Sequence, residues 1–130
     1  MNHVDVVAML AVLQYIAFGA LVAKARGTYG VKAPAVTGSE PFERTYRVQM
    51  NTLELLVALL PALYAAAHYW PSAYVAAAGA VYLVGRIVYW RAYVAKPSSR
   101  GLGFLLSIAP VMGLALAALV AALLGKASVN

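Results

Sequence analysis

The sequence has no cysteine and few charged residues. Without cysteine it can form no disulfide, no thiolate metal site and no cysteine nucleophile, so any thiol chemistry needs a thiol from the substrate. Charged residues make up 11% of the chain and only 4 residues are acidic, whereas about 25% charged residues are usual in soluble domains. The two histidines, His3 and His68, show no metal-ligand spacing, so no metal site is predicted.

Apolar residues, by contrast, make up 64% of the 130 residues. A soluble chain of this size could not bury so much apolar surface. Four apolar runs of about 20 residues stand out, and a helix of that length crosses a hydrocarbon core of about 30 Å. Because backbone groups cannot stay unpaired in lipid, each run should be a helix. We predict an all-α membrane protein, a single four-helix domain over residues 1–130, with helices at roughly 4–23, 48–67, 73–94 and 103–124.

Basic residues mark two of the three connections between these runs. They are Lys24, Arg26, Lys32, Arg44 and Arg47 in or beside the first, and Arg91, Lys96 and Arg100 in or beside the third. The short second connection, around Pro71, has none. Because lysine and arginine favour cytoplasmic loops, we expect the first and third loops in the cytoplasm. We interpret the net charge of +6 as topology signals and headgroup contacts, with no nucleic-acid partner.

The second run carries three polar residues, Arg47, Asn51 and Glu54, at spacing i, i+4, i+7. On a helix they fall within an arc of about 60°. Charged residues within membrane spans are costly and therefore favour a functional interpretation. A buried carboxylate needs a partner, since burying a lone charge costs several kcal/mol.

The third run carries a matching stripe of Tyr82, Arg86, Tyr89 and Tyr93. If the two stripes face each other or a neighbouring subunit, they form a site for a small ligand with several charges, since arginine binds carboxylates and glutamate binds amines. Two simpler interpretations remain open. Glu54 and Arg86 could form a buried ion pair that only fixes helix register, and the tyrosines could be interfacial anchors.

Residues 42–54, FERTYRVQMNTLE, closely resemble the helix-two signature of the MAPEG family, the membrane-associated proteins of eicosanoid and glutathione metabolism. The shared pattern is E-R-x-x-R-x-x-x-N-x-x-E. Residues 81–100, VYLVGRIVYWRAYVAKPSSR, resemble the third helix and the following turn of that family. The resemblance covers essentially the whole chain. Within the family, the chain is similar to the leukotriene-C synthase and microsomal glutathione transferase branches. The compact chain looks like a bacterial-type member, which implies the bacterial inner membrane.

This resemblance implies a homotrimer that binds glutathione as cosubstrate between adjacent subunits. One subunit would contact glutathione through Arg47, Asn51, Glu54, Tyr89 and Tyr93. The neighbour would contribute Arg26 and Gln49. Arg100 matches the arginine proposed to hold the glutathione thiol as thiolate in the leukotriene-C synthase branch. A nearby guanidinium lowers the pKa of a thiol, which supports such a role.

Some positions depart from that branch. Leu55 stands where eicosanoid-making members often carry tyrosine, and Gly27 where leukotriene-C synthase has a second functional arginine. Val57 replaces a proline of that synthase, and Pro61 lies one turn later. These departures argue against leukotriene synthesis in particular and leave the glutathione-binding residues untouched.

The resulting hypothesis is a membrane glutathione transferase or peroxidase whose partners are glutathione, the lipid bilayer and a lipophilic electrophile or hydroperoxide. One alternative is a small multidrug-type transporter. Those proteins carry their key glutamate in the first helix, whereas the first run here has only Asp5 at its start. The other alternative is a non-catalytic MAPEG-like scaffold, because a fold does not fix a function.

Overall fold

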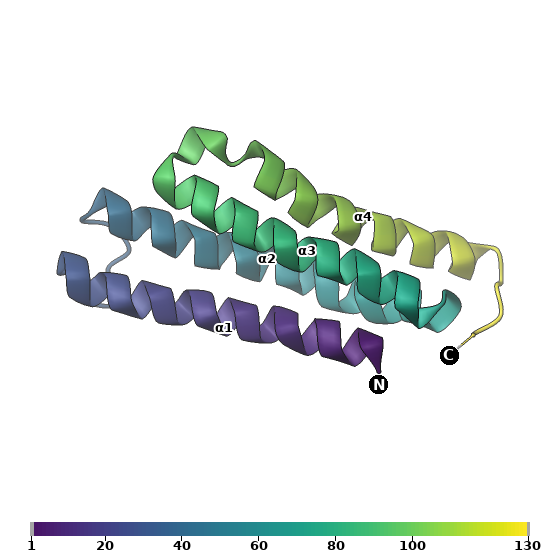
Figure 1. Ribbon diagram of the computed structural model, residues 1–130. Coiled ribbons are helices and arrows are strands. Elements are labelled where there is room, and N and C mark those ends of the chain that lie inside the picture. Colours follow the sequence, from purple (N-terminus) through teal and green to yellow (C-terminus); the bar gives the residue numbers. More distant parts are fainter. Residues whose placement is uncertain (1, 130) are drawn as a thin grey trace.

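The computed structural model describes residues 2–129 and contains four long helices that lie side by side (Figure 1). They are α1 His3–Tyr29, α2 Glu40–Tyr69, α3 Ser72–Ala95 and α4 Gly101–Leu123, with a short 3-10 helix, η1 Pro97–Ser99, before α4. Each long helix is apolar and long enough to cross a membrane. Within the described residues there is no strand, so the predicted all-α four-helix architecture is confirmed.

The first connection is shorter than the sequence suggested. The predicted helices left residues 24–47 between them, but α1 continues to Tyr29 and α2 begins at Glu40. Gly30 ends α1 in the left-handed conformation, φ 70°, and its N–H donates to the carbonyl of Arg26. Pro41 lies in the first turn of α2, where proline is tolerated because its missing N–H would have no helical partner.

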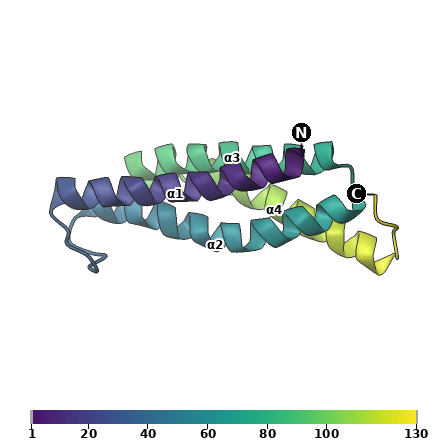
Figure 2. The same cartoon turned by 90° about the horizontal axis from the view of Figure 1, so that it is seen from below.

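The two ends of the bundle differ in what they carry. Figure 1 shows the first connection and η1 at one end, and both termini with the α2–α3 turn at the other. We call the first of these the basic end, because Arg44, Lys96 and Arg100 lie there. Figure 2 shows the same lengthwise arrangement from a second direction. Only Trp70 and Pro71 separate α2 from α3, so the second connection is as short as the sequence predicts, and the two helices run antiparallel.

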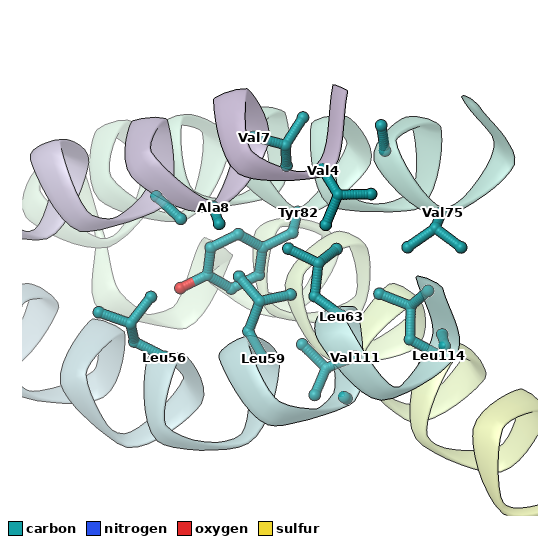
Figure 3. Close-up of a cluster of buried hydrophobic side chains, with 14 of the residues drawn as sticks. Val4, Val7, Ala8, Leu56, Leu59, Leu63, Val75, Tyr82, Val111 and Leu114 are labelled. Carbon is teal, nitrogen blue, oxygen red and sulfur yellow. The ribbon is translucent and has the colours of Figure 1, made fainter. Parts of the chain in front are cut away.

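An apolar core fills the half of the bundle away from the basic end. Figure 3 shows Leu59, Leu63 and Val111 around the ring of Tyr82, with Val4 of α1 above them. Tyr82, Leu59 and Leu63 are fully buried. This core joins all four helices. It places α2 and α3, each of which packs against all three other long helices, at the centre of the bundle.

Helices α3 and α4 approach closely at two glycines. A Cβ atom on Gly85 would lie 2.6 Å from the carbonyl carbon of Leu106, and one on Gly103 would overlap the backbone of Tyr89. Small residues permit such close approach between membrane helices. The contact sets Ser107 of α4 directly beside the α3 face that carries Arg86 and Tyr89.

Candidate functional site

Arg86 lies fully buried at the junction of α2, α3 and α4. Its Nε donates to Ser107 Oγ on α4 at 2.9 Å. Its Nη1 donates to two groups on α2, Asn51 Oδ1 at 2.8 Å and Thr52 Oγ1 at 3.1 Å. One guanidinium therefore connects three helices through charge-assisted hydrogen bonds, which are stronger than neutral ones.

The two hydroxyls beside Arg86 are oriented by their own helices. Thr52 Oγ1 donates to the carbonyl of Val48 at 2.7 Å, and Ser107 Oγ donates to the carbonyl of Gly103 at 2.7 Å. A hydroxyl has a single proton, so each oxygen keeps its lone pairs for Arg86. Arg86 is thus held by neutral acceptors within the described part of the chain, and its Nη2 is buried without a hydrogen-bond partner there.

Glu54 does not pair with Arg86. Its Oε1 lies 3.1 Å from Nη2 of Arg47, which is about two turns earlier on the same face of α2. The side chain of Glu54 is 59% exposed and that of Arg47 is 50% exposed. The interpretation of a buried Glu54–Arg86 ion pair is therefore wrong. The arc of about 60° that holds Arg47, Asn51 and Glu54 lies at the edge of the helix–helix contact. Asn51 therefore faces inward, while the two charged residues remain at the surface of the chain.

Two tyrosines of α3, Tyr89 and Tyr93, form a stack on the guanidinium of Arg86. Cζ of Arg86 lies 4.4 Å from the centroid of the Tyr89 ring. The rings of Tyr89 and Tyr93 are stacked, with centroids 5.4 Å apart and planes inclined by 9°. Tyr89 is buried and Tyr93 is half-buried, so the inner part of the stack is not an interfacial anchor. The stack leads from the buried cation toward the basic end.

A pocket of about 380 Å³ opens between α2 and the end of α3. Its lining includes Arg47 and Tyr93, together with Arg44 and Pro97. Arg44 donates from Nη1 to the carbonyl of Val94 at 3.1 Å and also pairs with Glu40. This clamp fixes the last turn of α3 against the first turns of α2. The carboxylates of Glu40 and Glu43 and the ring of Tyr46 complete the polar lining. The pocket therefore offers charged groups of both signs, a lining suited to a ligand that carries both carboxylate and ammonium groups.

Arg100 occupies the cap position between η1 and α4. Arg100 is exposed, and its side chain has no hydrogen-bond partner among residues 2–129. Its backbone carbonyl accepts the N–H of Phe104 at 3.0 Å, which starts α4. The side chain is free to meet a ligand at the basic end.

Arg26 and Gln49 lie apart from the other candidate residues of the chain. Arg26 donates from Nη1 to the carbonyl of Ala35 at 2.7 Å, and its Cζ lies 4.8 Å from the Phe42 ring centroid. Gln49 packs against α1, where a Cβ on Gly19 would lie 2.8 Å from its Nε2. The single chain thus brings neither residue to the Arg86 cluster.

Sequence reasoning missed Thr52 and Ser107. Both are small hydroxyl residues in apolar runs, a signal that is weak because such residues often bond only to their own helix. In the part of the chain that is described, no cluster of three histidine, cysteine, aspartate or glutamate residues could hold a metal ion. The site is built from guanidinium, amide, carboxylate, hydroxyl and phenol groups, which bind charged organic ligands.

Comparison with known proteins places this chain in a family. The model of the MAPEG family matches residues 5–120. The uncharacterized protein sll1147 of Synechocystis sp. is 43% identical over 114 residues, covering 88% of this chain and 83% of that protein. Human microsomal glutathione S-transferase 2 is 38% identical over 102 residues, covering 78% and 69%. Bovine leukotriene C4 synthase is 34% identical over 94 residues, covering 72% and 63%.

The matched segment covers α2 and α3 whole and all but the outermost residues of α1 and α4. It also contains the candidate site residues from Arg26 to Arg100. The resemblance drawn from residues 42–54 and 81–100 is thereby confirmed. The chain is an integral, multi-pass membrane protein and belongs to the MAPEG family.

Proposed function

We propose that this protein is a membrane glutathione transferase. The observation that carries the proposal is the combined set of Arg47, Asn51, Glu54, Tyr89 and Tyr93 around one edge of α2, in a chain similar to a microsomal glutathione S-transferase and a leukotriene C4 synthase. Glutathione has two carboxylates, one ammonium group and two amides. The side chains of this edge provide a guanidinium for one carboxylate, a carboxylate for the ammonium group and hydrogen-bonding groups for the peptide.

Each residue has a role that follows from its chemistry. Arg47 binds a carboxylate of glutathione, since a guanidinium takes a carboxylate bidentately. Glu54 binds the ammonium group, and Asn51 and the tyrosine hydroxyls hydrogen-bond to the peptide. The ion pair of Arg47 and Glu54, at 3.1 Å, keeps the two charges neutralised until the ligand replaces it.

We propose that the subunits assemble as a homotrimer with the site between them. Glu54 lies near the middle of α2 with its side chain 59% exposed on the single chain. A carboxylate at that depth is costly against lipid, and such residues face a bundle interior or a water-filled cavity. A neighbouring subunit covers it and contributes Arg26 and Gln49, which one chain leaves outside its own cluster.

Arg100 is proposed to stabilise the glutathione thiolate. Its exposed side chain at the basic end makes no hydrogen bond or ion pair among the described residues. A guanidinium lowers the pKa of a neighbouring thiol, and each unit of pKa corresponds to about 1.4 kcal/mol. The thiolate then attacks the electrophilic carbon, a sulfur–carbon bond forms, and the leaving group departs with the electron pair.

The second substrate is a lipophilic electrophile that arrives through the bilayer, while glutathione enters at the basic end. We propose that this end faces the cytoplasm of a bacterial inner membrane, as its lysines and arginines favour. With a lipophilic hydroperoxide the same site acts as a peroxidase. Two glutathione molecules are then oxidised to the disulfide, and the hydroperoxide is reduced to an alcohol and water.

The test compares three arginine and glutamate variants in purified protein. Arg100→Ala should lower turnover at least tenfold with little change in glutathione affinity, whereas Arg47→Ala and Glu54→Gln should weaken binding. Arg91→Ala is the matched control, since Arg91 is exposed near the same end and stacks on Trp90. Full activity of Arg100→Ala would remove its catalytic role. Proton-coupled drug uptake by vesicles would favour a transporter, and binding without conjugation a scaffold.

A further inference from the structure

We propose that Arg86 is a positioning residue that fixes the side-chain amide of Asn51 as a hydrogen-bond donor toward glutathione. The inference rests on the proposed function and adds to it the class of ligand atom to which Asn51 donates. Arg86 itself is fully buried. It acts through Asn51 Oδ1, which it contacts at 2.8 Å.

The orientation of the amide follows from the donors of Arg86. A guanidinium carries only N–H groups, so the atom of Asn51 that faces it must be the oxygen. The Nδ2 atom then lies on the other side of the amide. It donates to no group within residues 2–129, and it is not fully buried by those residues. The amide N–H groups therefore remain accessible to a ligand.

Arg86 cannot easily release this amide. Its Nε is held by Ser107, and its Nη1 is shared with Thr52, whose own proton is used within α2. Its face lies against the ring of Tyr89, which in turn stacks on Tyr93. One buried cation therefore fixes the amide and the tyrosine pair together.

A fixed donor has a consequence for specificity. On α2, Asn51 is one turn from both Arg47 and Glu54. An amide locked with its N–H groups outward binds a carbonyl or carboxylate oxygen and rejects an ammonium group. The ammonium group of glutathione is thus left to Glu54. This fixes the direction in which the peptide lies along α2.

Asn51→Asp separates this role from a purely structural one. The carboxylate keeps an oxygen toward Arg86 and makes a charge-assisted bond, so the helix junction is retained. It has no donor for the ligand. We expect a melting temperature no lower than that of the wild type and glutathione affinity at least tenfold weaker. Both are measured on the purified full chain in detergent, by thermal unfolding and by calorimetric titration with glutathione.

Ser107→Ala is the matched control because it removes one bond of Arg86 and leaves the Asn51 bond in place. It should lower the melting temperature and change affinity less than twofold. Arg86→Lys, which loses the planar fork that holds the amide, should weaken binding severalfold and provides a second test if Asn51→Asp does not fold.

Unchanged affinity in Asn51→Asp or in folded Arg86→Lys would overturn the inference. It would also be overturned if Ser107→Ala lost as much affinity as Asn51→Asp, because Arg86 would then act through helix packing alone. These results leave the binding of glutathione by the wild type intact. A wild-type protein that binds no glutathione would instead overturn the proposed function, and this inference with it.

Discussion

Two arginines in the membrane-crossing helices, Arg86 and Arg47, are stabilised in opposite ways. Arg86 is fully buried and bonds to three neutral oxygens on two other helices. Arg47 is half exposed and pairs with a carboxylate on its own helix. The buried cation is committed to the fold, because its acceptors would be left unpaired without it. The outer one can exchange its partner for a ligand.

This difference teaches how one stripe of polar residues can serve both structure and binding. Asn51 lies between the two arginines and belongs to both regions, since its oxygen faces Arg86 and its amide N–H groups remain accessible. Substitutions that remove these contacts should therefore cost less stability the farther they lie from Arg86.

Arg86→Met should give the largest effect. Its loss leaves Asn51, Thr52 and Ser107 without their donor, and unsatisfied buried groups cost about 1–3 kcal/mol each. We expect a loss of roughly 3 kcal/mol or failure to fold, measured by thermal unfolding in detergent. Arg47→Met is the matched control and should cost less than about 1 kcal/mol, as exposed ion pairs do. Equal losses in the two variants would contradict the contrast between the arginines.

Gly85→Ala should give the next largest effect, because the added Cβ would meet the α4 backbone at Leu106 and Ser107. Overpacking of this kind costs about 1–3 kcal/mol, and the displaced Ser107 should also disturb the Arg86 bonds. Gly113→Ala is the control, since a Cβ there meets nothing within 4 Å. Thermal unfolding of both variants checks the result, and a stable Gly85→Ala protein would show that the α3–α4 contact is loose.

Thr52→Val removes one acceptor of Arg86 and keeps the shape of the side chain. Interhelical hydrogen bonds in membranes contribute about 0.6–2 kcal/mol, so we expect a loss of about 1 kcal/mol. Glutathione affinity should change less than twofold, because the Asn51 bond remains. A tenfold loss of affinity, seen by calorimetric titration, would place Thr52 in the binding site.

Tyr64→Phe should give the smallest effect. The hydroxyl of Tyr64 donates to Asp5 at 2.8 Å on the exposed surface, away from the Arg86 cluster. Its loss should cost less than about 0.5 kcal/mol, as surface substitutions usually do, and leave glutathione binding unchanged. Weaker binding in this variant, measured alongside the wild type, would show that the far end of the bundle influences the site.

The fold could be predicted from sequence because lipid leaves few options for four apolar runs of about 20 residues. The helix ends could not be predicted as well. The apolar runs left residues 24–47 outside any helix, yet Gly27 lies inside α1 and Pro41 within the first turn of α2. A turn-forming residue near a helix end is compatible with both positions.

The sequence predicted which residues form the candidate site better than it predicted which of them contact one another. Helical spacing placed Asn51 and Glu54 on one face, but spacing alone cannot say which side of that arc meets another helix. Glu54 was therefore matched with Arg86, whereas Ser107 and Thr52, on no predicted stripe, hold it instead. The roles of Arg26 and Gln49 depend on a second subunit and stay predictions.

The most direct test of the account is calorimetric titration of the wild-type protein with glutathione, followed by the ultraviolet thiolate signal at neutral pH. The account predicts binding together with a thiolate signal that is lost in Arg100→Ala and kept in Arg91→Ala. Folded protein that shows no binding at millimolar glutathione would contradict the central claim that this edge of α2 is a glutathione site.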